Sequence, residues 1–333
     1  VDELTSDSAA PPTGGGRLGS VASERFGYWN EAFDAFGERP LAGLGAGSFE
    51  LARLAHRNDG GTARRAHGFV AQTVSDLGLA GAIAALTLLA AWLAAATRAT
   101  ALQPRRWWQA PARARPRWDS ERAALVALAL AAVVYGVQSA LDWTWFVPGL
   151  TVSALVAAGF VAGRGPSTAA RRPRASAPRL LACAGVVLIA VFCGWAIWQP
   201  VAADRATARA YDLIGAGKPL AALRETTRAR DLNPYSPQPR YATAVALADL
   251  DREQTAIAVL RATAADRPRD PAPWLRIATI ELDRRDAPAP ALAAAEQALR
   301  RDPHSARIVA TRDRAAQLLA ARQAASAPAP SSP

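Results

Sequence analysis

Residues 65–96 read RAHGFVAQTVSDLGLAGAIAALTLLAAWLAAA, and this stretch decides the fold class. It begins with the basic and polar segment Arg65-Ala66-His67 and has further polar residues at Gln72 and Asp76. No charged residue occurs over Leu77–Ala96. A helix needs about 20 consecutive apolar residues to cross a membrane. The stretch therefore predicts a membrane-spanning helix with a semi-polar beginning at the outer interface.

Apolar runs of this kind occur four times along the chain, and two arginine-dense connectors lie between them. Short loops rich in Lys and Arg stay on the cytoplasmic side of a membrane. Both connectors are therefore predicted to be cytoplasmic, which puts the segments before the first run and after the fourth run outside. The runs are Phe69–Ala96, Arg122–Phe146, Pro148–Gly163 and Leu180–Gln199, and the connector arginines are Arg98, Arg105, Arg106, Arg113, Arg115, Arg117, Arg164, Arg171, Arg172, Arg174 and Arg179.

The net charge of +11 would ordinarily favour a nucleic-acid partner. Eleven arginines fall in the two connectors, however, where the cytoplasmic bias already explains them, so we expect no nucleic-acid binding.

Cys183 and Cys193 lie ten positions apart in the fourth run and cannot bond to each other within one helix. The sequence suggests no metal site. Since the first segment must be carried outside, we also expect further sequence upstream of Val1.

The segment before the first run predicts a helical extracytoplasmic loop over residues 23–68, after a disordered or linker stretch over residues 1–22. Three glycines within residues 43–47 predict a tight turn, and a second short helix is expected over Ser48–Ala55. Apolar and aromatic residues spaced by three and four predict one face of an amphipathic helix over Ser23–Phe36. These residues are Phe26, Trp29, Ala32, Phe33 and Phe36.

After the fourth run the pattern changes to paired helices. Turn prolines recur at intervals of 34 and 35 residues, in Asn233-Pro234, Arg267-Pro268 and Asp302-Pro303. A period near 34 with paired helices and a turn proline is typical of tetratricopeptide repeats. We expect a repeat domain over residues 201–322 and a disordered tail over residues 323–333.

These observations together predict an all-α fold class. The chain is expected to be a polytopic membrane protein with four transmembrane helices over residues 69–200, a helical extracytoplasmic loop and a C-terminal α-solenoid of tetratricopeptide-like repeats.

Four short motifs resemble a known family when they are taken in order. They are Arg25-Phe26-Gly27-Tyr28-Trp29, the turn PLAGLGAGSF over Pro40–Phe49, the step Ala66-His67, and DLGLAG over Asp76–Gly81. Over residues 23–163 the chain resembles the C-terminal half of the O-antigen ligase / polysaccharide polymerase family. The resemblance implies a membrane glycosyltransferase of the cytoplasmic (inner) membrane. Its donor would be a glycan on undecaprenyl diphosphate, its acceptor a hydroxyl on the outer side, and it would need no metal or cofactor.

The resemblance also implies roles for individual residues. Arg25 matches the family's loop arginine and would hold the diphosphate, since the guanidinium fork suits phosphate oxygens. Arg64 and Arg65 are adjacent candidates for the same phosphates. His67 matches the family's histidine, and its neutral imidazole would take the proton from the acceptor hydroxyl. Asp142 is a secondary candidate.

Each of these residues also has a structural interpretation. Arg25 would then be an exposed charge on an amphipathic helix, His67 a polar cap of the first span, and Asp142 a structural partner or helix cap. Arg64 and Arg65 would be solvated loop charges or contacts to lipid headgroups.

Two functional alternatives stay open beside the enzyme. In the first, the chain is a non-catalytic membrane-anchored adaptor, whose repeats bind a partner protein in an envelope-assembly complex. The family usually has Asn where this chain has Gly68, and it has further N-terminal spans; both points favour the adaptor. The second alternative, a transporter, has little support because the sequence shows no discontinuous, charged pair of intramembrane helices.

Overall fold

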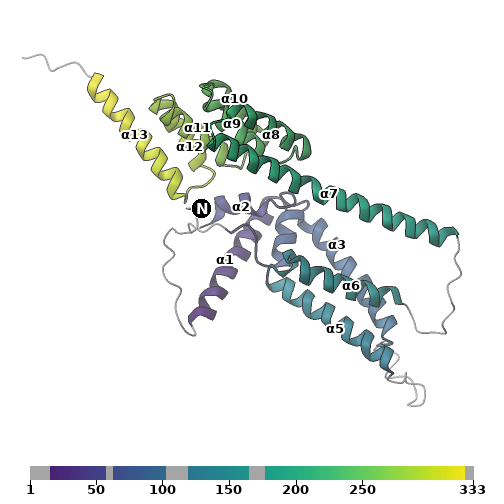
Figure 1. Cartoon of the computed structure of the whole chain (residues 1–333). Coiled ribbons are helices and arrows are strands. Elements are labelled where there is room, and N and C mark those ends of the chain that lie inside the picture. Colours follow the sequence, from purple (N-terminus) through teal and green to yellow (C-terminus); the bar gives the residue numbers. More distant parts are fainter. Residues whose placement is uncertain (1–15, 58–62, 103–118, 165–176, 327–333) are drawn as a thin grey trace, which may run out of the picture. The chain divides into compact units, whose positions relative to one another are not determined.

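The computed structural model describes residues 16–57, 63–102, 119–164 and 177–326 (Figure 1). Within these ranges every regular element is a helix, which confirms the all-α prediction. The chain divides into two compact units, one built from α1 to α6 and the other from α7 to α13. Most of the first linker, the Asn58–Gly61 loop, most connector arginines and the end of the tail lie outside the described residues.

In the first unit, α1 (Gly16–Glu38) and α2 (Phe49–His56) form the predicted helical loop. The helix α1 begins seven residues before the expected start, so residues 16–22 are helical and do not form a linker. Its packed face agrees with the expected one at Trp29 and Ala32 and differs from it at Phe26 and Phe33. Ala32 and Ala35 are fully buried, whereas Phe26 is 60% and Phe33 50% exposed. Alanines let α1 approach α2 closely, and the large aromatic residues are left outside this contact.

Three helices of the first unit form an apolar bundle: α3 (Phe69–Ala99), α5 (Ser120–Leu141) and α6 (Pro148–Arg164) lie side by side (Figure 1). Their large apolar side chains are mostly exposed, as on Leu88 of α3, which is 72% exposed. Such a surface suits lipid and is rare on soluble proteins. By length and composition, α3 and α5 can cross a membrane, as can the Leu180–Gly215 part of α7, while α6 is a shorter apolar helix.

Polar contacts tie the ends of this bundle. The Arg122 guanidinium donates from Nε to the carbonyl of Thr100 over 2.9 Å, so α5 begins where α3 ends. The Arg164 Nε donates to Glu121 over 2.6 Å, so α6 returns to the end at which α5 begins. At the other end, α5 and α6 are joined by the short helix η3 (Thr144–Phe146).

The helix α3 is interrupted at Gly78, which has φ 61° and ψ −155°. The turn between α1 and α2 supplies the hydrogen bonds that the interruption removes. Leu79 and Ala80 donate their N–H groups to the carbonyls of Pro40 (2.8 Å) and Leu41 (3.1 Å). In return, Leu44 and Gly45 donate to the carbonyls of Ser75 (3.1 Å) and Asp76 (2.9 Å). One apolar helix, α3, is therefore discontinuous, which the sequence pattern did not predict.

The second unit begins with α7 (Ala177–Gly215), a single helix that runs through Pro200. The expected boundary between membrane region and repeats at residue 200 therefore falls inside one helix. Near this point the Arg205 guanidinium lies over the Trp198 ring, 5.1 Å from its centroid. The last turns of α7 pack on α8 through small residues, of which Ala206 and Ala210 are fully buried.

Antiparallel helical hairpins follow, and each helix packs on the next in the chain. First helices of successive hairpins start 34 residues apart, at residues 238, 272 and 306, which matches the predicted period. The helices are α8 (Pro219–Leu232), α9 (Gln238–Ala248), α10 (Glu253–Asp266), α11 (Ala272–Asp283), α12 (Pro288–Leu299) and α13 (Ala306–Ser326).

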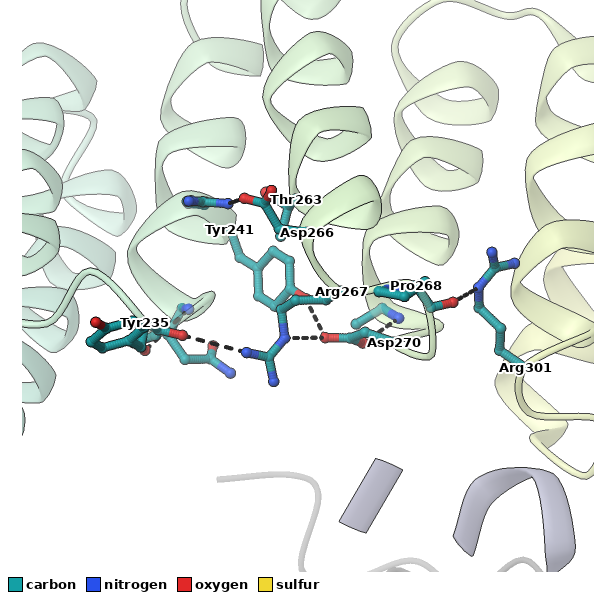
Figure 2. Close-up of polar contacts among 12 residues, drawn as sticks. Tyr235, Tyr241, Thr263, Asp266, Arg267, Pro268, Asp270 and Arg301 are labelled. Atoms are coloured by element: carbon teal, nitrogen blue, oxygen red, sulfur yellow. Dashed lines mark hydrogen bonds and ion pairs between the residues drawn. The ribbon is translucent and has the colours of Figure 1, made fainter. Parts of the chain in front are cut away.

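Side chains at the hairpin turns link successive repeats (Figure 2). The Arg267 guanidinium reaches the carbonyl of Tyr235 in the preceding turn (3.4 Å), and Arg301, 34 residues later, reaches that of Pro268 (2.7 Å). Asp270 caps α11 and accepts the Tyr241 hydroxyl over 2.7 Å. Burial and the Asp270 carboxylate raise the pKa of the Tyr241 hydroxyl, which therefore stays protonated and a donor at physiological pH.

Candidate functional site

The carboxylate of Asp76 organises the end of the first unit at which α3 begins. It is nearly buried and accepts hydrogen bonds from the N–H groups of Gly47 (2.8 Å) and Phe49 (3.2 Å) and from the Ser48 hydroxyl (3.3 Å). Two of these donors stand at the N-terminal end of α2, where a negative charge is favoured by the helix dipole. Asp76 thus caps α2 from α3 and holds the glycine turn against the interruption in α3.

A side-chain relay connects Asp76 to the peptide before His67. The amide of Gln72 donates to Asp76 over 2.9 Å, and its oxygen accepts the N–H of Ala66 over 2.9 Å. On the other side, the Trp29 indole donates to the carbonyl of His67 over 3.1 Å. His67 itself has φ 51°, in the left-handed region that costs a non-glycine residue of the order of 1 kcal/mol. The strained backbone of His67 is therefore tethered on both sides.

The imidazole of His67 is supported by a stack of side chains. Its ring lies on the Tyr28 ring, with centroids 5.1 Å apart and an angle of 26° between the planes. The Arg53 guanidinium lies over Tyr28, 5.1 Å from the ring centroid. Arg53 is fully buried and pairs with Glu31 through two bonds of 2.7 and 3.2 Å. This bidentate pair neutralises the buried cation and fixes its place behind Tyr28.

Arg25 of α1 reaches the end of α5. Its Nη2 lies 3.3 Å from Oδ2 of Asp142, which is the C-cap residue of α5. Asp142 also accepts the N–H of Trp143 over 2.7 Å, so the carboxylate is held from two directions. The Arg25 side chain remains 36% exposed. Since a guanidinium has five N–H donors, the bond to Asp142 leaves donors of Arg25 for an anion.

The predicted residues His67, Arg25 and Asp142 are brought together at one end of the bundle. Arg25 lies one turn before Trp29, whose indole holds the His67 carbonyl. Next to His67, Gly68 lies so close to α5 that a Cβ would stand 2.9 Å from the carbonyl oxygen of Ala140.

The two other predicted arginines point to different neighbours. The Arg65 guanidinium lies over the Phe146 ring of η3, 3.4 Å from its centroid, and so stays at the same end of the bundle. Arg64 pairs with Glu50 of α2 over 3.6 Å, and its side chain is 80% exposed. Arg64 is therefore a solvated loop charge in this structure, as the structural interpretation expected.

The close approach at Gly68 leaves no room for a larger residue at this position. A Cβ would also meet the Trp29 indole nitrogen at 2.8 Å, so only glycine fits between α1 and α5. We expect Gly68→Asn to push these helices apart and to lower the free energy of unfolding by about 1–3 kcal/mol. Thermal unfolding in detergent measures the loss. Gly149→Asn is the matched control, because a Cβ at Gly149 meets open space. Equal melting of the two variants would contradict the packing role of Gly68.

Sequence reasoning missed the residues that position His67, namely Tyr28, Gln72 and Asp76. A signal was available, since Gln72 and Asp76 stand four apart in an otherwise apolar run, where polar residues face protein partners. Within the residues that the structure describes, no group of three or more His, Cys, Asp or Glu side chains is placed to hold a metal ion. The chemistry available at this end of the bundle is that of the His67 imidazole, stacked on Tyr28, and of the Arg25 guanidinium, oriented by Asp142.

Comparison with known proteins gives a likeness to helical repeats. No protein-family model matches the chain, and no curated protein matches it. Among solved structures, the chain is similar to the NMR structure of the first TPR domain of the human RPAP3 protein, with 18% sequence identity and a TM-score of 0.34. The match covers 38% of this chain and 98% of that domain.

Proposed function

We propose that the chain is a membrane glycosyltransferase of the O-antigen ligase / polysaccharide polymerase type. It transfers a glycan from undecaprenyl diphosphate to an acceptor hydroxyl on the outer side of the cytoplasmic membrane. The observation that carries the proposal is the placement of His67. Its strained backbone is tethered by Trp29 and by the Gln72 relay, beside the pair formed by Arg25 and Asp142. Strain that the surroundings hold in place is typical of functional sites.

The proposed reaction assigns one task to each of these groups. The imidazole of His67 takes the proton of the acceptor hydroxyl as its oxygen bonds to the anomeric carbon. The bond from that carbon to the diphosphate oxygen breaks, and its electron pair leaves with undecaprenyl diphosphate. The guanidinium of Arg25 stabilises the charge that develops on this leaving group. Asp142 orients Arg25, and Arg65 on Phe146 adds positive charge at the same end.

The proposal includes four membrane crossings, by α3, α5, α6 and the first part of α7. The contact between Arg164 and Glu121 supports a crossing by α6, because it returns α6 to the end at which α5 begins. At 17 residues, α6 is at the lower limit for a spanning helix. With both arginine-dense connectors in the cytoplasm, the His67 end faces outward, as does the repeat domain.

The test is transfer by the full chain in vesicles that contain lipid-linked oligosaccharides extracted from its native membranes. We expect His67→Ala and Arg25→Ala each to slow the release of undecaprenyl diphosphate about 100-fold or more, as for the loss of a general acid–base group or of a charge-stabilising donor. His56→Ala and Arg209→Ala are the controls, since these residues pair with Glu38 and Glu225, which are not candidate site residues. Membrane insertion should be unchanged in all four variants.

A second function is favoured by the repeat domain, which would act as an adaptor for an envelope-assembly protein. The observation behind it is a hollow of about 290 Å³ between α9 and α11, which Arg307 at the start of α13 also lines. If both site variants release undecaprenyl diphosphate at the wild-type rate, the assignment of the site falls and the adaptor function takes its place.

A further inference from the structure

The glycine turn over residues 40–47 is hydrogen-bonded to α3 at one position along the helix axis. The carbonyls of Pro40 and Leu41 accept the N–H groups of Leu79 and Ala80. These two residues belong to the apolar stretch of α3 that begins at Leu77. Backbone hydrogen bonds of about 3 Å place Leu41 at the depth of residues 79 and 80.

The lengths of α3 and α5 show where that level lies in a membrane. The inner ends of the two helices are tied through Arg122 and Thr100. From Gly78 to Ala99, α3 rises about 32 Å, and the 22 residues of α5 rise about 33 Å. Both values match the hydrocarbon thickness of about 30 Å. The interruption at Gly78, and the turn attached to it, therefore lie at the outer boundary of the hydrocarbon.

The surface of the turn at this level is apolar. Leu41 is 73% exposed, and its neighbours on α3, Leu77 and Leu79, are 45% and 44% exposed. No charged residue occurs within Pro40–Gly47, which reads PLAGLGAG. Along the sequence, the nearest charged residues are Arg39 on one side and Glu50 on the other, and in space the nearly buried Asp76 carboxylate contacts Gly47. An exposed apolar patch that continues the apolar surface of a spanning helix fits lipid.

Part of the polar backbone of the turn is satisfied by other protein groups, as membrane depth requires. Leu44 and Gly45 donate to carbonyls of α3, and Gly47 donates to the Asp76 carboxylate. Irregular backbone is tolerated at membrane depth only where protein groups satisfy it. We propose that the glycine turn, residues 40–47, is inserted into the outer leaflet of the membrane, with Leu41 among the lipid acyl chains. This inference rests on the proposed crossing of the membrane by α3, and it is independent of glycosyl transfer.

Accessibility of a spin label tests the insertion in the full chain. Cys183→Ala and Cys193→Ala remove the native cysteines, and Leu41→Cys, Leu88→Cys and Glu50→Cys each add one labelling position. The labelled proteins are placed in vesicles of phosphatidylcholine and phosphatidylglycerol. Collisions with oxygen, which concentrates among acyl chains, are compared with collisions with a water-soluble nickel chelate. We expect Leu41→Cys to resemble Leu88→Cys in colliding more with oxygen than with nickel, although at a shallower depth than residue 88, which lies about 15 Å along α3 from Gly78. The label at residue 50, where Glu50 is charged and exposed, should collide often with the nickel chelate.

Three other outcomes would contradict the inference, and each has its own pattern of collisions. A label at residue 41 that meets nickel as often as the one at residue 50 places the turn in water. A label shielded from both reagents shows that protein, and not lipid, covers Leu41. If residue 88 also meets nickel, α3 does not cross the membrane, and the proposed topology falls with the inference. Ala42→Cys, at an exposed neighbouring position, guards against a local effect of replacing Leu41.

Discussion

Replacement of Gly78 by alanine is expected to unfold the end of the first unit at which the glycine turn packs on α3. Its φ of 61° and ψ of −155° form a combination that is accessible almost only to glycine. A Cβ there would stand 2.6 Å from the nitrogen of Gly43 and 2.7 Å from the carbonyl of Leu41. Both contacts are with backbone, so no side chain can move aside. Strain and overpacking together should cost about 3–5 kcal/mol, which thermal unfolding in detergent measures.

Gly136→Ala is the matched control for Gly78→Ala. Gly136 lies inside α5, also in an apolar helix, and a Cβ there meets open space. Alanine is favoured over glycine in a helix interior by about 0.5–1 kcal/mol, so this variant should melt at the wild-type temperature or slightly above it. Limited proteolysis should cut the Pro40–Gly47 turn in Gly78→Ala only. A Gly78→Ala variant as stable as Gly136→Ala would show that the interruption in α3 does not exist.

Replacement of Asp76 by alanine is expected to be the second large loss. Its carboxylate accepts four hydrogen bonds, from the backbone of Gly47 and Phe49 and from the side chains of Ser48 and Gln72. Removal of the acceptor leaves buried donors unsatisfied, and we expect a loss of about 3–5 kcal/mol in the free energy of unfolding. Without Asp76 the Gln72 side chain also loses its anchor, so the backbone at His67 should loosen and glycan transfer should fall.

Two further variants separate the hydrogen bonds of Asp76 from a general effect of charge. Asp76→Asn keeps one acceptor oxygen, and we expect a loss of stability between those of the wild type and Asp76→Ala. Asp34→Ala removes an exposed carboxylate from α1 and should stay within about 0.5 kcal/mol of the wild type. If Asp76→Ala and Asp34→Ala unfold at the same temperature, the capping of α2 by Asp76 is not a source of stability.

The elements themselves could be predicted because their signals are local. The apolar runs located α3 and α5, and the turn prolines located the hairpins to within a few residues. Each signal is carried by residues that are neighbours in the sequence. One such signal is the regular spacing of apolar residues, and another is a proline that cannot continue a helix. Local signals also led to an error at Pro200, where the helix continues because its next turns pack on α8.

The features that position the candidate site could not be predicted in the same way. The interruption at Gly78 is stable only because the carbonyls of Pro40 and Leu41, far back in the sequence, replace the missing helical bonds. Likewise the packed face of α1 is set by the pair of Glu31 with Arg53, which turns Phe26 and Phe33 outward. Both arrangements depend on contacts between distant segments, and residue spacing within one segment does not encode them.

The unbroken course of α7 has a mechanical consequence. From Pro200 to Gly215 the helix extends about 24 Å beyond its apolar stretch, and α8 packs against this extension. A helix without a loop behaves as a lever, so a force applied to the hairpins tilts the apolar half of α7. The helix bends most easily at Pro200, because proline has no N–H to donate to the preceding turn. A force on the hairpins should therefore reach the apolar half of α7 as torque.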